Sequence, residues 1–195
     1  MSQSLDKLSN EELWQLFPII ISEHQPEWKN TYEAEKKVIQ ESIGNDHIAR
    51  VNHIGSTFVP NLPAKPTIDI LLEVKKDVNT EWLIQTIKSI GYIYSPQPGN
   101  PPPHMMFMKG YTDEGFKGQA YHLHVRYPGD WNELYFRDYL CKHNETAQKY
   151  GELKRTLKEK FEHDRDKYTT EKSDFIKGIT ELARKEFPDK YIPTK

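Results

Sequence analysis

The amino-acid sequence predicts an α+β fold, a small mixed β-sheet flanked by helices and followed by a helical C-terminal part. Apolar residues recur with a helical period up to about residue 44, alternate as in strands over much of 47–126, and become helical again from Asp130 onward. At 195 residues the chain is long enough to bury one core. We therefore expect an N-terminal extension (1–25), an α/β core (26–128) and a C-terminal helical part (129–195) in a single compact unit.

Composition narrows the class of protein. Lys and Arg number 27 against 29 Asp and Glu, a net charge of −2, so no overall positive field attracts nucleic acid. One cysteine, Cys141, excludes an internal disulfide framework and a multi-cysteine zinc site, and we expect it to be a small buried side chain. Neither a secretory leader nor a membrane-spanning run is visible, so the expected location is the cytoplasm.

The first elements are predicted from capping and periodicity. A capping-box pattern at Ser9 opens a short helix over 13–17, and residues 19–21 are expected to form a brief strand. Pro26 stands near the start of an amphipathic helix that Gly44 ends. Beyond it we expect strands at 47–54 and 67–74, a helix at 80–90 and the start of a strand at 92–94.

The second half of the chain begins with a proline-rich loop at 96–103. Strands at 105–109 and 119–126 are expected to form a hairpin across a polar connection at 110–118. Three helices follow, centred on 131–139, 150–161 and 175–183. The charge-rich stretch 154–172 is predicted to be a solvent-facing helical region with a loop, and Tyr150 and Tyr168 are predicted to be packing residues.

A turn that contains one glycine and two hydroxyl-bearing residues precedes a lysine, and after it a single acidic residue stands in an apolar run. Gly55 lets the backbone approach an anion, and Ser56 and Thr57 add hydroxyl groups beside it. Asp69 is costly to bury without a partner, which favours a functional role or pairing with Lys65 or a histidine. Lys65 itself either contacts phosphate or balances Asp69.

The run from His53 to Ile70 resembles the signature of the GrpB family, a nucleotidyltransferase-like family of the polymerase-beta superfamily. The resemblance extends over about 26–183. The other matching positions are Pro26, Trp28, Gly91, Tyr92, His122, His124, Trp131, Leu134, 136–140, Tyr150, Lys154, Tyr168, Lys172, Phe175 and Ile176.

This resemblance implies a nucleotidyltransferase-like core in which a Gly-Ser turn holds nucleotide phosphates. In the superfamily, two carboxylates one residue apart on the next strand bind divalent metal. Gly55 and Ser56 match the turn and Asp69 matches the first carboxylate, but Leu71 stands where the second is expected.

Other side chains are therefore needed as metal ligands. Glu73 lies on the same strand face as Asp69 but about 13 Å away at ~3.3 Å per residue, too far to share one metal without a bulge. His122 and His124 share one face of a strand that is able to approach Asp69. Two imidazoles and one carboxylate favour Zn, Mn or Fe over Mg, although simple solvent exposure of both histidines is an equal alternative.

The leading functional hypothesis is a metal-dependent nucleotidyltransferase with Mg or Mn, or with Zn if the histidine pair ligates. Asp69 and Lys65 are its candidate catalytic residues, and Asp69, His122 and His124 its candidate metal ligands. Its candidate substrate-binding residues are Gly55, Ser56, Thr57, Arg137, Lys154 and Lys172. The expected ligand is a nucleotide or another phosphorylated small molecule, with the acceptor and the oligomeric state left open.

Two alternatives belong to other functional classes. The first is a ligand-binding module on the same fold that has lost transferase chemistry, which Leu71 supports. The second is a His/Asp metal-dependent phosphoesterase. For Arg137, Lys154 and Lys172, the alternative to phosphate contact is that each is a solvated charge on a helix face.

Overall fold

The computed structural model describes residues 5–97, 99–100 and 102–193. The helices are α1 (Asn10–Leu16), α2 (Glu27–Ile43), α3 (Thr80–Ser89), α4 (Asn132–Lys142), α5 (Asn144–Phe161), α6 (Arg165–Thr170) and α7 (Ser173–Glu186). The strands are β1 (Ile48–Ile54), β2 (Thr67–Val74), β3 (Ile93–Ser95), β4 (Met105–Thr112) and β5 (Gly115–Arg126). A short 3-10 turn, η3 (Ser56–Phe58), follows β1.

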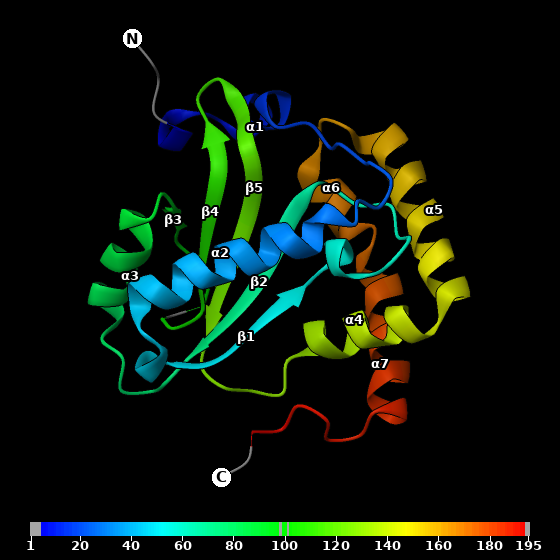
Figure 1. The fold of residues 1–195 in the computed structure, drawn as a ribbon. Coiled ribbons are helices and arrows are strands. Elements are labelled where there is room, and N and C mark those ends of the chain that lie inside the picture. The colour runs from blue at the N-terminus through cyan, green and yellow to red at the C-terminus, as the bar shows by residue number, and fades with distance from the viewer. Residues whose placement is uncertain (1–4, 98, 101, 194–195) are drawn as a thin grey trace.

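The strands form one mixed sheet in the order β1-β2-β5-β4-β3. β2 and β5 run parallel, whereas the other neighbouring pairs are antiparallel. Helix α2 lies across one face of this sheet, and the C-terminal helices stack beside its β1 edge (Figure 1). The α+β prediction, a mixed sheet flanked by helices with a helical C-terminal part, is confirmed.

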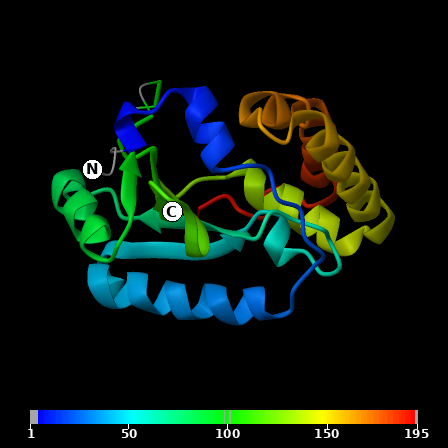
Figure 2. The same ribbon diagram turned by 90° about the horizontal axis from the view of Figure 1, so that it is seen from above.

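Alternation along the strands separates two faces of the sheet. On the α2 face, fully buried residues of β2 such as Ile68 and Ile70 pack with Trp28 and Ile39 of α2 in the largest apolar cluster. The opposite face carries Asp69 and its same-face neighbours. Figure 2 shows α1 on that side of the sheet, away from α2. The main core and the polar residues of interest therefore lie on opposite sides of β2.

The N-terminal segment is packed into the fold. Ser9 caps α1 through the predicted capping box. The predicted strand at 19–21 is wrong, since that region forms only an isolated bridge between Ser22 and Ala64 within the described residues. Ile19 is instead held by burial against Leu157 and Tyr168 of the C-terminal helices.

The hairpin is tighter than predicted. β4 continues to Thr112 and β5 starts at Gly115, so most of the predicted polar connection at 110–118 is strand. The physical reason is aromatic packing, because the rings of Tyr111 and Phe116 lie 5.2 Å apart across the hairpin and both contact Phe17. Residues 98 and 101 of the predicted proline-rich loop lie outside the described residues.

The stretch 154–172 is helical with a short loop before α6, and most of its residues are exposed or half-buried, as predicted. Lys154 and Lys172 are the charged exceptions, only 3% and 9% exposed. Tyr150 and Tyr168 are buried, which confirms them as packing residues. Cys141 is exposed, so its predicted burial is wrong; it lies on an outward face of α4, where helix geometry rather than residue type decides burial.

The division into three segments at 25/26 and 128/129 stays a prediction, and residues 1–4 and 194–195 at its ends lie outside the described residues. In the part of the chain that the structure describes, no helix has both the length and the apolar character needed to cross a membrane.

Candidate functional site

The turn after β1 is built around Asp69. Ile54 at the end of β1 is the register partner of Asp69 on β2, and Gly55 follows with φ 72° and ψ −175°. A Cβ atom at Gly55 would collide with Oδ2 of Asp69. Both the backbone conformation and the close approach to the carboxylate therefore require glycine, and the turn holds Asp69 beside Ser56.

Thr57 stabilises this turn from within. Its hydroxyl oxygen lies 2.9 Å from Nε2 of His53 and donates to the Thr67 carbonyl at 3.4 Å. Burial lowers the pKa of His53 to about 4, so its ring is neutral at pH 7 and Nε2–H donates to Thr57. Thr57 is thus engaged inside the fold, whereas Ser56 remains half-buried and lies beside Tyr150.

The parallel pairing of β2 and β5 brings His122 beside Asp69. The two residues are register partners, and Nδ1 of His122 lies 3.2 Å from Oδ1 of Asp69. On the other side of the ring, Nε2 lies 2.7 Å from the Tyr111 hydroxyl. Burial opposes the charge of Asp69, but the hydrogen bond from His122 and neighbouring positive charges lower its pKa, so Asp69 is a carboxylate at pH 7.

The metal site expected from the sequence is only partly assembled. His124 follows His122 on the same strand face, with ring centroids 6.5 Å apart. Within the described residues, however, no group of three or more His, Cys, Asp or Glu side chains is arranged to hold a metal ion. Both ring nitrogens of His122 already have partners in the protein, so ligation would require one of these hydrogen bonds to break.

Position 71 belongs to the core. Leu71 is fully buried with Ile54 and Leu134, so the place of the expected second carboxylate is apolar. Glu73, further along the same face, is fully buried and bonded to Arg50, the Gly129 amide and the Trp131 indole. Neither position supplies a free second carboxylate beside Asp69.

Three lysines from separate segments of the chain converge near Asp69. Lys65 precedes β2, Lys154 lies in α5 and Lys172 precedes α7. Burial is the main cause that lowers their pKa values, to about 8, about 6 and about 7 respectively. Neighbouring positive charges lower each of these pKa values further. The Asp69 carboxylate raises all three, but by less than burial and the neighbouring cations lower them. We call Lys65, Lys154 and Lys172 the lysine cluster.

The surroundings of the lysine cluster are built by aromatic rings. Lys154 donates to the Pro63 carbonyl and lies over the ring of Tyr150. Lys172 lies 4.1 Å from the ring centroid of Tyr168, which Lys65 also approaches. Among the described residues, the buried Tyr168 hydroxyl has no hydrogen-bond partner. The lysine cluster therefore combines three amino groups, whose protonation an anion would favour, with an unsatisfied hydroxyl group.

Comparison with known proteins places this arrangement in a family. The family model described as GrpB protein matches residues 18–182, which is most of the chain and includes every residue of the lysine cluster. This chain belongs to the GrpB family.

Relatives agree with this assignment. The glutamate-rich protein GrpB of Alkalihalophilus pseudofirmus is 34% identical over 83% of this chain and 93% of its own length. The UPF0157 protein PA4798 of Pseudomonas aeruginosa is 32% identical over 79% of this chain and UPF0157 protein YqkA of Bacillus subtilis is 29% identical over 83%. The chain spans only 63% and 46% of the lengths of these last two relatives.

A solved GrpB structure has the same fold. The crystal structure of the conserved protein GrpB from Enterococcus faecalis aligns with a TM-score of 0.75 at 31% identity, and covers 86% of this chain and 99% of that one. Membership of the GrpB family thus rests on sequence and on structure.

Arg137 is one predicted substrate-binding residue that is engaged elsewhere in this GrpB-family chain. Its guanidinium donates to the His53 carbonyl at 2.9 Å, to the Tyr191 hydroxyl at 2.9 Å and to Asp138 at 2.8 Å. These contacts join α4 to β1 and to the C-terminal segment. Arg137 therefore has a clear structural role, and phosphate contact by it stays a prediction.

Two residues that contact or act on the site residues of this family member are not predictable from motifs. Arg165, the first residue of α6, acts electrostatically on Lys65 and Lys172, and its guanidinium carbon lies 6.0 Å from the Tyr111 ring centroid. Tyr111 lies in the segment predicted to be a polar connection. Neither stands in a recognisable motif, and only the aromatic character of Tyr111 within a polar segment pointed to burial.

Proposed function

We propose that this protein binds a phosphorylated small molecule beside Asp69, with the phosphate groups held by the lysine cluster and Arg165. The observation that supports this proposal is the convergence of the buried Lys154 and Lys172 with the half-buried Lys65, where burial and neighbouring positive charges lower their pKa values. Gathering lysines where burial and mutual repulsion oppose their protonation costs the fold stability, so their retention is best explained by an anionic ligand that restores their charge. Ser56, in its glycine turn, adds a hydroxyl group for the same ligand.

The direct test is calorimetric titration with inorganic triphosphate in buffer free of divalent metal. We expect binding, and we expect Lys154→Gln and Lys65→Gln each to weaken it by about tenfold or more, since a hydrogen bond to a charged group contributes roughly 1.5–3 kcal/mol. Lys177→Gln is the matched control, because Lys177 is exposed on α7. Affinity that is unchanged by both cluster variants would contradict the proposal.

Metal-dependent nucleotidyl transfer is a second candidate, and the observation that favours it is the placement of His122 and His124 near Asp69. The residues present do not fit a pair of carboxylates, because Leu71 is buried in the apolar core. A non-catalytic ligand-binding module therefore agrees better with the donor set than two-metal transfer does.

Asp69→Asn separates these candidates. In metal-free buffer the variant is expected to bind triphosphate at least as tightly as the wild type, because one repulsive charge is removed. If Asp69 holds a metal, Mn²⁺ will strengthen nucleoside triphosphate binding by the wild type and not by the variant. If Mn²⁺ has no effect on the wild type, metal-dependent transfer is rejected; phosphate release without transfer would indicate a phosphoesterase.

A further inference from the structure

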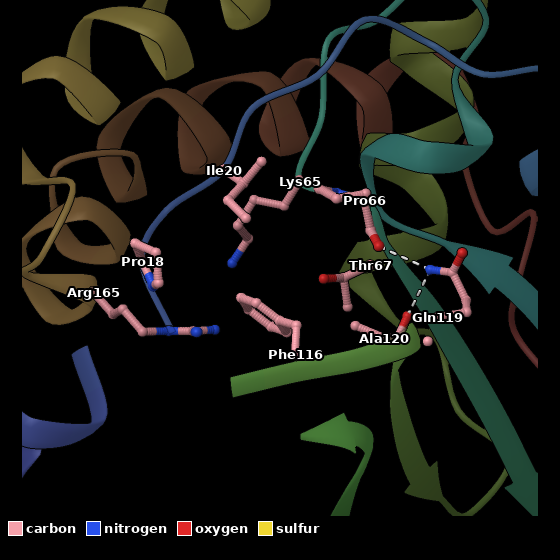
Figure 3. Close-up of a pocket in the computed structure, with 10 residues that line it drawn as sticks. Pro18, Ile20, Lys65, Pro66, Thr67, Phe116, Gln119, Ala120 and Arg165 are labelled. Atoms are coloured by element: carbon pink, nitrogen blue, oxygen red, sulfur yellow. Dashed lines mark hydrogen bonds between the residues drawn. The ribbon is translucent and has the colours of Figure 1, made fainter. Parts of the chain in front are cut away.

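A cavity of about 160 Å³ opens directly beside the Asp69 site. Thr67, two residues before Asp69 on the same face of β2, is one of its lining residues. Its walls include Lys65 and Arg165 together with Pro18, Ile20 and Phe116, as Figure 3 shows. Because Lys65 also belongs to the lysine cluster, the cavity and the proposed phosphate site share a wall.

The cavity has two chemically different sides. The ammonium group of Lys65 and the guanidinium of Arg165 both point into it (Figure 3). Nη1 of Arg165 donates to the Phe17 carbonyl at 3.2 Å, and the guanidinium also interacts with the Tyr111 hydroxyl. These contacts fix the guanidinium, and its five N–H donors exceed these two partners.

The other side of the cavity is apolar. Ile20 is 44% exposed and Phe116 is 38% exposed, and both are among the large apolar side chains that the fold leaves uncovered. They lie together on this one cavity with Pro18. Scattered exposed apolar residues need no explanation, but two that share a cavity with two cations form a surface complementary to an amphipathic anion.

We propose that this cavity receives a ring-sized apolar group of the same ligand whose phosphate the lysine cluster holds, so that the ligand is a ring-bearing phosphate ester. The inference rests on the proposed function and adds the chemical class of the ligand. The size agrees, because an engineered apolar cavity of about 150 Å³ accommodates benzene. The charge of the cavity also agrees with such a ligand, since Lys65 and Arg165 line it where the ring and the phosphate of the ligand would join.

Phenyl phosphate and methyl phosphate test the inference, because they carry the same charge and differ in the apolar group. We expect calorimetry to show phenyl phosphate binding about tenfold more tightly, as partial burial of a ring predicts. Ile20→Ser and Phe116→Ser should each reduce the affinity for phenyl phosphate toward that for methyl phosphate, and leave methyl phosphate unchanged. Ile20→Ser is the safer variant, since Phe116 also packs on Phe17 and Tyr111.

The matched control is Leu182→Ser, because Leu182 is 45% exposed on α7 and does not line the cavity. Equal affinities for the two esters would overturn the inference and leave phosphate binding intact, whereas failure of both esters and of triphosphate to bind would overturn both proposals. Inorganic triphosphate should compete with phenyl phosphate. Undiminished phenyl phosphate binding in saturating triphosphate would overturn the assignment of ring and phosphate to one ligand.

Discussion

The buried Lys172 is expected to destabilise the folded protein while it helps to bind the ligand. Its side chain is buried over the Tyr168 ring, and its pKa is lowered to about 7, chiefly by desolvation. We expect Lys172→Met to raise the free energy of unfolding by roughly 1 kcal/mol at neutral pH, because a buried charge is replaced by a side chain of similar length. The same change should weaken triphosphate binding by about tenfold.

Chemical denaturation and calorimetry of one preparation measure both effects. Lys177→Met on the exposed face of α7 is the control and should change neither quantity appreciably. A variant that loses stability while keeping its affinity would show that Lys172 serves the fold rather than a ligand.

Anion binding should depend on pH. The pKa values of Lys154, Lys172 and Lys65 are about 6, about 7 and about 8, so the free protein loses positive charge across this range as the pH rises. Sulfate keeps its two charges throughout, and we therefore expect its affinity to fall with increasing pH. Binding should also take up protons, which titration in buffers of different ionisation enthalpy measures.

The lowered lysine pKa values are expected to make the free energy of unfolding rise with pH, whereas they make the affinity for anions fall. The unfolded chain keeps its lysine protons up to about pH 10, whereas the folded chain begins to release them near pH 6. Between these values the unfolded state binds more protons, so this contribution to the free energy of unfolding rises with pH. In anion-free buffer, the stability advantage of Lys172→Met over the wild type should therefore shrink as the pH rises through about 7, because the wild-type lysine becomes neutral in the folded state. A constant difference would contradict the lowered pKa of Lys172.

The turn between β1 and η3 depends on Gly55. Gly55→Ala should lower the free energy of unfolding by about 2 kcal/mol or more, because the positive φ is strained for alanine and the added Cβ collides with Asp69. Gly118→Ala is the matched control, since Gly118 has φ 69° but no heavy atom within 4 Å of the place that an added Cβ would occupy. Its cost should be about 1 kcal/mol, from backbone strain alone.

Thermal unfolding of the two glycine variants measures this difference. Equal destabilisation would mean that close approach to the carboxylate contributes nothing. Gly55→Ala is further expected to weaken anion binding, because it displaces the turn that carries Ser56.

Elements with strong local signals were predictable. The capping box at Ser9 and the glycine at 44 correctly bounded α1 and α2, and β2 was predicted with its observed ends. The hairpin of β4 and β5 was predicted correctly, but its connection was predicted too long. The polar residues of 110–118 suggested a loop, whereas the contact of Tyr111 and Phe116 with Phe17 that extends the strands joins segments far apart in sequence. Burial of Lys154 and Lys172 had no local signal at all, since charged residues in a helix are normally solvated.

The C-terminal segment joins the two halves of the molecule. The Tyr191 hydroxyl bonds Arg137 and Asp138 of α4, and the Tyr191 ring lies 5.6 Å from the guanidinium carbon of Arg50 on β1. We expect Tyr191→Ala to lower the free energy of unfolding by roughly 2 kcal/mol through the lost hydrogen bonds and ring contacts.

Triphosphate affinity should remain unchanged in Tyr191→Ala, because these contacts lie apart from the lysine cluster. Ile192→Ala, at a side chain that is 52% exposed, should affect neither stability nor affinity. A parallel loss of affinity in Tyr191→Ala would show that Arg137 contributes to the ligand site after all.

Local patterns in the sequence alone were enough to determine the α+β class, most element boundaries, the glycine turn before Asp69 and the resemblance to the GrpB family. These properties depend on the spacing of neighbouring residues. The tertiary structure decided which strand lies beside β2, and thereby that His122 faces Asp69 and that Leu71 is core. It also decided that lysines from three separate segments meet in a largely buried cluster, because burial and charge proximity arise only when distant segments pack together.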